Sequence, residues 1–152
     1  MTIRFATIED ISDILDLGEK MVEESRFRSF GLNREKMGKV LESMISETTQ
    51  SVIIVAVIDN KIIGGLGGYA IDFFFCDVKI AQDRFFYIRS ESRGSPAAIK
   101  ILLAFRKWAE QHNAHELNIN MSVAIEIERF NQMMGKLGFQ CCGSNFSLPL
   151  KS

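Results

Sequence analysis

The most constraining feature of the sequence is an apolar strand that leads through a turn of small residues into a long amphipathic helix. The strand covers residues 80–88, and the turn at 93–98 reads Arg-Gly-Ser-Pro-Ala-Ala. From Pro96 to about Gln111, apolar residues recur near one helical face. The first amides of a helix lack intrahelical acceptors and carry partial positive charge, so this turn suits a phosphate group.

Strand and helix signals alternate along the rest of the chain. Residues 23–32 indicate a loop or a short broken helix. Because strands precede both C-terminal helices, the order favours a mixed α/β sheet with helices on its faces. With 152 residues, the chain is long enough for one domain. We predict helices over 8–22, 34–45, 96–111 and 125–137, and strands over 3–6, 51–58, 61–75, 80–88, 115–121, 139–142 and 145–150.

Capping and turn residues mark several element boundaries. Thr7 with Asp10 three positions later is typical of a capping box, and Asn33 suits the N-cap of the second helix. Asp59-Asn60 predicts a tight hairpin turn, and Gly138 predicts the end of the last helix.

Composition excludes several classes of protein. The chain is 47% hydrophobic and 24% charged, which excludes a disordered chain. A net charge of -1 provides no basic excess for nucleic acid. Since the sequence has no signal peptide and no run of about 20 apolar residues, we expect a soluble, cytoplasmic protein with no membrane partner.

Three cysteines, Cys76, Cys141 and Cys142, give an odd count, and the adjacent pair cannot close without severe strain. Neither histidine stands at metal-ligand spacing from them. We therefore expect all three to pack as small apolar residues in a reducing compartment, with no metal site.

Three short motifs lie at the start, middle and end of this pattern. The chain opens with Ile-Arg-x-Ala-Thr-x-x-Asp (3–10), the central turn aligns with Arg/Gln-x-x-Gly-x-Gly/Ala and satisfies its last position with Ala98, and Lys-Leu-Gly-Phe (136–139) closes the last helix. These motifs and the element order resemble the GCN5-related N-acetyltransferase (GNAT) superfamily over nearly the whole chain. The general pattern, including Trp-Ala-Glu (108–110), is closest to small acetyltransferase-like proteins of phages and bacteria.

The resemblance implies one GNAT-like, acyl-CoA-binding domain over residues 1–152. Its sheet would be mixed and mostly antiparallel, with six to seven strands and about four helices packed on its faces. The implied activity is an acetyl-CoA-dependent N-acetyltransferase in which a primary amine attacks the thioester directly, without a metal.

The resemblance also implies where acetyl-CoA would bind. Strand amides would pair with the pantetheine arm, and the turn would hold the pyrophosphate. Arg89 and Arg93 flank that turn, and Arg93 is the better candidate for a charge-assisted contact. The implied cofactor-binding residues are Phe86, Tyr87, Ile88, Arg93, Gly94, Ser95, Ala97 and Ala98.

Three positions depart from the family pattern. Pro96 replaces the usual glycine and has no N–H to offer a phosphate, although it suits the first turn of a helix. Met134 replaces a tyrosine that often serves as general acid, and Ile127 replaces an asparagine at the head of the last helix. These departures place catalysis in question.

The sequence does not identify a catalytic residue. Glu23, Glu24, Asp72 and Asp83 are candidate bases, although a solvated surface charge is the more ordinary interpretation of each. His112 is expected to lie at a helix C-terminus or to be exposed.

Two clusters have a structural and a functional interpretation. The glycines of residues 64–68 indicate a bent strand, or a strand that borders a substrate cleft. Phe73-Phe74-Phe75 would pack under the third helix, or expose rings at a pocket or subunit interface.

Three functional hypotheses stay open. The leading one is acetyl transfer to a primary amine of a small molecule, a peptide N-terminus or a lysine, chosen by residues 23–32. The second is a catalytically impaired GNAT-fold protein that acts as a binding or assembly module. The third is a longer acyl chain, accommodated by Met133, Met134 and the phenylalanines. A homodimer is compatible with each.

Overall fold

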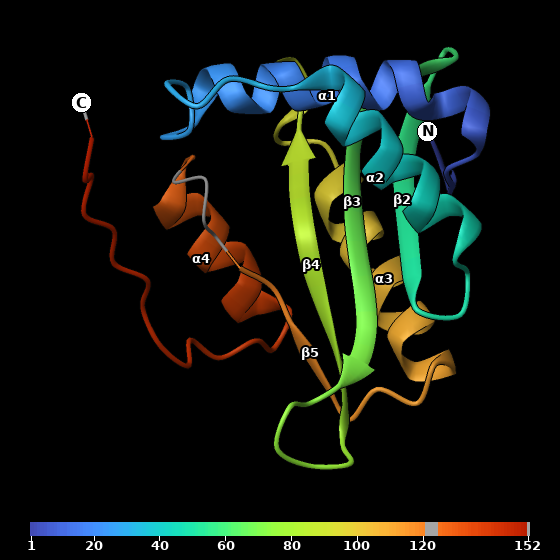
Figure 1. Cartoon of the computed structure of the whole chain (residues 1–152), viewed down its shortest axis with the longest axis vertical. Helices are drawn as coiled ribbons and strands as arrows, with labels where there is room; N and C mark the ends of the chain where they lie inside the picture. Colours follow the sequence, from blue (N-terminus) through green and yellow to red (C-terminus); the bar gives the residue numbers. More distant parts are fainter. Residues whose placement is uncertain (121–124, 152) are drawn as a thin grey trace.

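The computed structural model describes residues 1–120 and 125–151, which form one five-stranded sheet with helices on both faces (Figure 1). The strands lie in the order β1-β2-β3-β4-β5. The strands are β1 (Thr2–Phe5), β2 (Ser51–Ile58), β3 (Lys61–Asp72), β4 (Lys79–Ile88) and β5 (Glu116–Asn118); the α-helices are α1 (Ile11–Glu24), α2 (Arg34–Ser46), α3 (Ala97–Gln111) and α4 (Ile127–Lys136); two short 3-10 helices are η1 (Ile8–Asp10) and η2 (Ser90–Ser92).

The sheet is mixed and mostly antiparallel, as expected. The three pairings among β1, β2, β3 and β4 are antiparallel, and β5 runs parallel to β4. Four α-helices also agree with the prediction. The predicted strand over 115–121 is shorter in the structure, and Met121 lies outside the described residues.

The expected six to seven strands are wrong for the described part of the chain, where five are found. Residues 139–142 and 145–150 form no strand. Phe146, Leu148 and Leu150 are each at least 79% exposed. Their spacing of two residues is typical of a strand, but a strand needs a partner edge for its hydrogen bonds, and no such pairing is found within the described residues.

Capping residues set the helix starts as predicted. The Asn33 side chain accepts a hydrogen bond from the Lys36 amide at 3.0 Å and caps α2. At the first helix, the Thr7 amide donates to Asp10 Oδ2 at 2.8 Å, and this turn is η1 before α1 begins. Arg4 holds the same carboxylate through two contacts of 2.7 and 3.0 Å.

The two hairpin turns differ in how well the sequence predicted them. Asp59 and Asn60 both have positive φ, at 49° and 62°, which confirms the tight turn between β2 and β3. The strand predicted to reach Phe75 instead ends at Asp72. Phe73, Phe74 and Phe75 form a turn in which their rings contact one another, and Phe74 and Phe75 are exposed, so packing under the third helix is wrong.

Two apolar cores lie on opposite faces of the sheet. One holds α1 and α2 against β2 and β3, with Leu41 and Val55 fully buried. The other holds α3 against the reverse face, with Ile54 and Phe105 fully buried, and α4 adds Met134 to it. Figure 1 shows α1 and α2 on the near face, α3 behind the sheet and α4 beside β4.

The glycine cluster of β3 gives room to large side chains. A Cβ at Gly67 would lie 2.3 Å from the Phe85 ring, and one at Gly68 would lie 2.5 Å from the Phe105 ring. The β3–β4 register also shifts between these two glycines. The structure therefore supports the bent-strand interpretation.

All three cysteines are exposed, so the prediction that they pack in the core is wrong. Cys76 lies in the β3–β4 turn, and Cys141 and Cys142 follow α4 in the segment that does not pack on the sheet. Within residues 1–120 and 125–151, no helix has both the length and the apolar character that crossing a membrane requires.

Candidate binding site between β4 and α4

Strands β4 and β5 pair only at their first residues and then diverge. The pairing runs from Ile80 to Gln82, and the bulge in β4 leaves Arg84 without a partner on β3. A bulge bends its strand and increases its twist. The Asn120 amide donates to Asp83 Oδ1 at 2.8 Å. At the point of divergence this hydrogen bond therefore goes to a side chain of β4 and not to its backbone.

The later half of β4 presents backbone groups to the resulting gap. The Arg89 amide donates to Ile63 O at 2.9 Å. Because hydrogen-bonding direction alternates along an antiparallel strand, Tyr87 bonds to β3, whereas Phe86 and Ile88 point their N–H and C=O groups away from it. Arg93 Nε donates to Ile88 O at 3.0 Å, which agrees with this direction.

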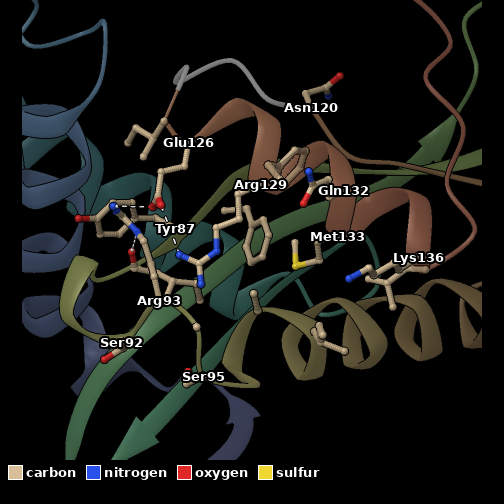
Figure 2. A pocket seen from close by; sticks show the side chains of 18 residues that line it. Tyr87, Ser92, Arg93, Ser95, Asn120, Glu126, Arg129, Gln132, Met133 and Lys136 are labelled. Carbon is tan, nitrogen blue, oxygen red and sulfur yellow. Dashed lines mark hydrogen bonds and ion pairs between the residues drawn. The ribbon is translucent and has the colours of Figure 1, made fainter.

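A cavity of about 430 Å³ occupies this gap, and we call it the β4–α4 cavity (Figure 2). Its walls come from β4, the turn before α3, α3 and α4. The size is in the range of small-molecule and cofactor sites. Its apolar lining includes Phe86, Ile88, Ala98, Ile99, Phe130, Met133 and Leu137, and its charged lining is Arg93, Glu126, Arg129 and Lys136.

The turn before α3 leaves several amides without an acceptor. Gly94 has φ of 93°, a left-handed conformation that favours glycine. The Ala97 amide donates to Ser95 Oγ at 3.3 Å, and the helical bonds begin with Lys100 to Pro96 O at 3.0 Å. Within the described residues, the amides of Gly94, Ala98 and Ile99 have no protein acceptor.

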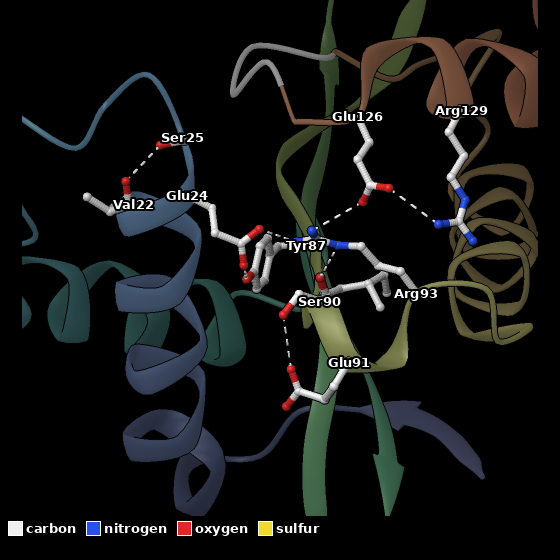
Figure 3. A network of polar contacts seen from close by, with 10 residues as sticks. Val22, Glu24, Ser25, Tyr87, Ser90, Glu91, Arg93, Glu126 and Arg129 are labelled. Carbon is white, nitrogen blue, oxygen red and sulfur yellow. Dashed lines mark hydrogen bonds and ion pairs between the residues drawn. The ribbon is translucent and has the colours of Figure 1, made fainter.

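Arg93 lies at the centre of a polar network that joins α1, β4 and α4 (Figure 3). Its Nη2 lies 2.8 Å from Glu24 Oε2, and its Nη1 lies 3.2 Å from Glu126 Oε2. The buried Nη2 has no aligned hydrogen-bond acceptor among the described residues, so Glu24 holds it as an ion pair. The guanidinium also lies over the ring of Tyr87. Its charge is therefore balanced inside the protein.

Tyr87 belongs to the same network. Its hydroxyl donates to Glu24 Oε1. Burial raises the pKa of Tyr87, and the hydrogen bond to Glu24 raises it further. The hydroxyl thus stays protonated and fixes the end of α1 against β4.

The sequence-based prediction of the binding site did not include the basic residues of α4. Arg129 and Lys136 line the cavity together with Gln132 and Met133. Arg129 Nη2 lies 3.0 Å from the position that a Cβ on Gly94 would take, so its guanidinium covers the turn. The spacing of three, four and seven residues places all four side chains on one helical face, which is the signal that could have identified them.

The three departures from the family pattern occupy different surroundings. Pro96 is the N-cap of α3 and has no N–H to offer the cavity. Met134 is buried in the core, whereas its neighbour Met133 lines the cavity. Ile127 is the first residue of α4 and is 47% exposed.

Of the candidate bases, Asp83 has the most unusual surroundings. It is only 7% exposed, and burial raises its pKa to about 6. Glu23 and Asp72 are exposed and lie near Lys20 and Lys79, respectively. Glu24 is committed to the Arg93 network.

Three other predicted positions lie away from the cavity lining, and one of them, Ala97, is fully buried in the core. Arg89 Nε donates to Ile62 O at 3.0 Å and so turns toward β3. His112 is the C-cap of α3, where its Nδ1 lies 2.8 Å from Trp108 O and its ring stacks on the indole, as expected for a residue at a helix C-terminus.

Comparison with solved structures identifies the fold. A ribosomal-protein-alanine N-acetyltransferase from Brucella melitensis biovar Abortus has a TM-score of 0.72, with 14% identity over 99% of this chain and 100% of that chain. An aminoglycoside 6'-N-acetyltransferase from Acinetobacter haemolyticus has a TM-score of 0.73, with 17% identity over 100% and 99%. A probable acetyltransferase has a TM-score of 0.76, with 22% identity over 100% and 99%.

No family model matches the sequence, and no curated protein matches it either. The similarity is therefore one of fold, and it extends over nearly the whole length of the chain and of these neighbours.

Proposed function

We propose that this chain, which has the fold of the GNAT superfamily, is an acetyl-CoA-dependent N-acetyltransferase that acts on a primary amine. The observation that carries the proposal is the β4–α4 cavity, which joins an unpaired strand edge to a turn with free amides. One long ligand with an amide-bearing arm and a diphosphate would satisfy both parts of the cavity.

The pantetheine arm would lie along β4 as an added strand. Phe86 offers an N–H and a C=O, and Ile88 offers its N–H, since Arg93 already occupies its C=O. The apolar walls formed by Phe130 and Met133 would exclude water from the arm.

The diphosphate would lie at the turn. Amides of Gly94 and Ala98 would donate to it, and Arg129 is the cation that already covers the turn. The missing N–H of Pro96 removes one donor from this cradle. Tyr87, Arg93 and Ala97 would position the site rather than contact the phosphates, because their polar groups are bound within the protein. Ser95 accepts from the Ala97 amide through Oγ, and its hydroxyl could still donate to a phosphate.

The chemistry needs few protein groups. The amine nitrogen attacks the thioester carbonyl carbon, the C–S bond breaks, and the acetyl group ends on nitrogen. The coenzyme A thiolate takes a proton, and the attacking nitrogen loses one to a base or to water. Asp83 is our candidate for that base, since it is the carboxylate at the divergence of β4 and β5.

The acceptor is proposed only as a class. The names of the neighbours specify a ribosomal-protein alanine in one case and aminoglycosides in another, and these acceptors share little beyond an amine. Because Met133 gives an adaptable apolar wall, comparing acetyl-, propionyl- and succinyl-CoA tests the acyl preference.

Calorimetry on matched Ser95 variants tests the site. Ser95→Asp keeps an acceptor for the Ala97 amide but adds a negative charge at the turn, whereas Ser95→Asn keeps an acceptor without the charge. We expect acetyl-CoA to bind the wild type and Ser95→Asn, and to bind Ser95→Asp about 10-fold more weakly or worse. No binding to the wild type at millimolar acetyl-CoA would contradict the proposal.

A catalytically impaired binding module is the second candidate. The buried Met134 favours it, because a thioether cannot donate a proton to the leaving thiolate and this one faces the core. Acetyl-CoA binding without acetylation of any member of a broad amine panel would support the module. Product formation with any amine would support the enzyme.

A further inference from the structure

Glu126, which lines the β4–α4 cavity, has an unusual conformation and unusual contacts. It is the N-cap of α4 and adopts a left-handed conformation, with φ of 45° and ψ of 51°. Its carboxylate bridges two arginines, with Oε2 3.2 Å from Arg93 Nη1 and Oε1 3.3 Å from Arg129 Nη1 (Figure 3). A residue other than glycine in this conformation needs compensating contacts, and the bridge supplies two.

The two arginines depend on Glu126 to different extents. Arg93 has a closer carboxylate in Glu24, at 2.8 Å, and keeps that partner without Glu126. Arg129 is 55% exposed, and Glu126 is its ion-pair partner among the described residues. The Arg129 guanidinium already lies over the turn. Without the Glu126 carboxylate, it would therefore be free to contact an anion bound there.

An anion at the turn would need the Arg129 guanidinium, which Glu126 occupies. Phosphate oxygens and carboxylate oxygens accept from guanidinium N–H groups in the same geometry. Of the charged side chains that line the cavity, Arg93, Arg129 and Lys136 are cationic and Glu126 is anionic. Glu126 therefore stands where a bound phosphate would take its charge-assisted contacts.

We infer that Glu126 is an internal competitor for the anionic ligand: its carboxylate occupies Arg93 and Arg129 in the empty site and must leave Arg129 when a diphosphate binds. This inference rests on the proposed function, because the diphosphate is that of coenzyme A. The charges of both arginines are therefore balanced in the empty site. As a result, the wild-type protein binds coenzyme A more weakly than its basic residues alone would allow.

Three variants separate this competition from a general effect of charge. Glu126→Gln removes the charge, and Glu126→Asp keeps it but shortens the side chain by about 1.5 Å, so an already long bridge cannot reach both arginines. Glu128→Gln removes a carboxylate from the same helical turn that makes no ion pair among the described residues. Coenzyme A is titrated calorimetrically into all three variants and the wild type at one salt concentration.

We expect Glu126→Gln and Glu126→Asp to bind coenzyme A about 3- to 20-fold more tightly than the wild type, and Glu128→Gln to stay within about twofold. If Glu126→Asp matches the wild type while both glutamine variants improve equally, the effect is one of net charge and the inference fails.

Failure of the inference is distinguishable from failure of the proposed function. Equal binding by all four proteins overturns the competitor role and leaves the coenzyme A site standing. Absence of binding by all four, with each still unfolding cooperatively on heating, overturns both. Because Glu126→Asp retains the charge at the start of α4, it keeps the test valid if Glu126→Gln fails to fold.

Discussion

Asp83 is a buried carboxyl group at the point where β4 and β5 diverge. The folded state raises its pKa from 3.8 to about 6 because burial disfavours the charged form. The folded state therefore holds the proton more tightly than the unfolded state. Ionised Asp83 lowers stability above pH 6, and this cost fades as the pH falls from about 6 toward 4.

Asp83→Asn is expected to stabilise the fold by about 1–3 kcal/mol at pH 8, and by about half as much at pH 5. Asparagine keeps an oxygen for the Asn120 amide and removes the buried charge. Urea unfolding at the two pH values measures the difference, with the exposed Asp77→Asn as control. If Asp83 is also the proton acceptor, the same variant loses about 100-fold or more in kcat. A stability gain equal at both pH values would argue against this account of the titration.

At the scale of single residues, sequence reasoning identified chemical types better than partners. It selected Arg93 for its charge near the turn, but the partners that balance that charge, Glu24 and Glu126, come from distant parts of the chain. Long-range ion pairs have no local sequence signal. By contrast, the Asn33 cap and the Asp59–Asn60 turn depend on neighbours within three residues and were predicted correctly.

Among elements, the β3–β4 pair most directly shapes the site. The register shift between Gly67 and Gly68 bends β4, and the bend lies just beyond Gln82, the last residue of β4 that pairs with β5. The two glycines let rings from β4 and α3 approach the sheet on opposite faces. A side chain at either glycine would therefore disturb the core on one face of the sheet.

Gly68→Ala is expected to destabilise the fold by about 1–3 kcal/mol, because its Cβ would lie 2.5 Å from the Phe105 ring and 3.0 Å from Gln82 O. Gly135→Ala is the matched control. It lies inside α4 with nothing within 4 Å of its Cβ position, so it should stabilise by about 0.5–1 kcal/mol. Chemical denaturation gives both values, and a neutral Gly68→Ala would show that Phe105 can move aside.

The elements themselves were predicted where pattern and packing agree. β2 and the α3 helix match their expected ranges closely, because a continuous β-branched run is typical of a strand buried on both faces and an amphipathic run of a helix buried on one. The final pair of strands was not found, because alternation at 145–150 is a preference that only a partner strand can realise. Phe73–Phe75 failed in the same way, since the turn at Asp72 overrides the β-propensity of phenylalanine.

Across the whole molecule, the segment after Phe139 contributes least to the core. Phe139 packs against the α3 face, and every residue from Gln140 to Lys151 is exposed. The fold should therefore stand without this segment.

A chain that ends at Phe139 is expected to keep its unfolding free energy within about 0.5 kcal/mol of the full chain. Thermal or urea unfolding of both chains at the same low concentration measures this. A large loss of stability in the shorter chain would show that the segment packs on the sheet or on a second copy in solution.

The location of the site could be predicted from the sequence, but its walls could not. Residues 86–98 are contiguous, so their strand-turn-helix order places them together on local grounds alone. The opposite wall comes from α4, and its position depends on how β5 leaves β4. A homodimer and relatedness to phage proteins stay predictions.

The exposure of all three cysteines affects how the proposed acetyl transfer can be assayed. A disulfide dye that reports liberated coenzyme A would also be consumed by the protein's own sulfhydryls, and this blank would scale with protein concentration. Replacing Cys76, Cys141 and Cys142 by serine removes that background without touching buried structure. Mass measurement of the acetylated amine avoids it altogether.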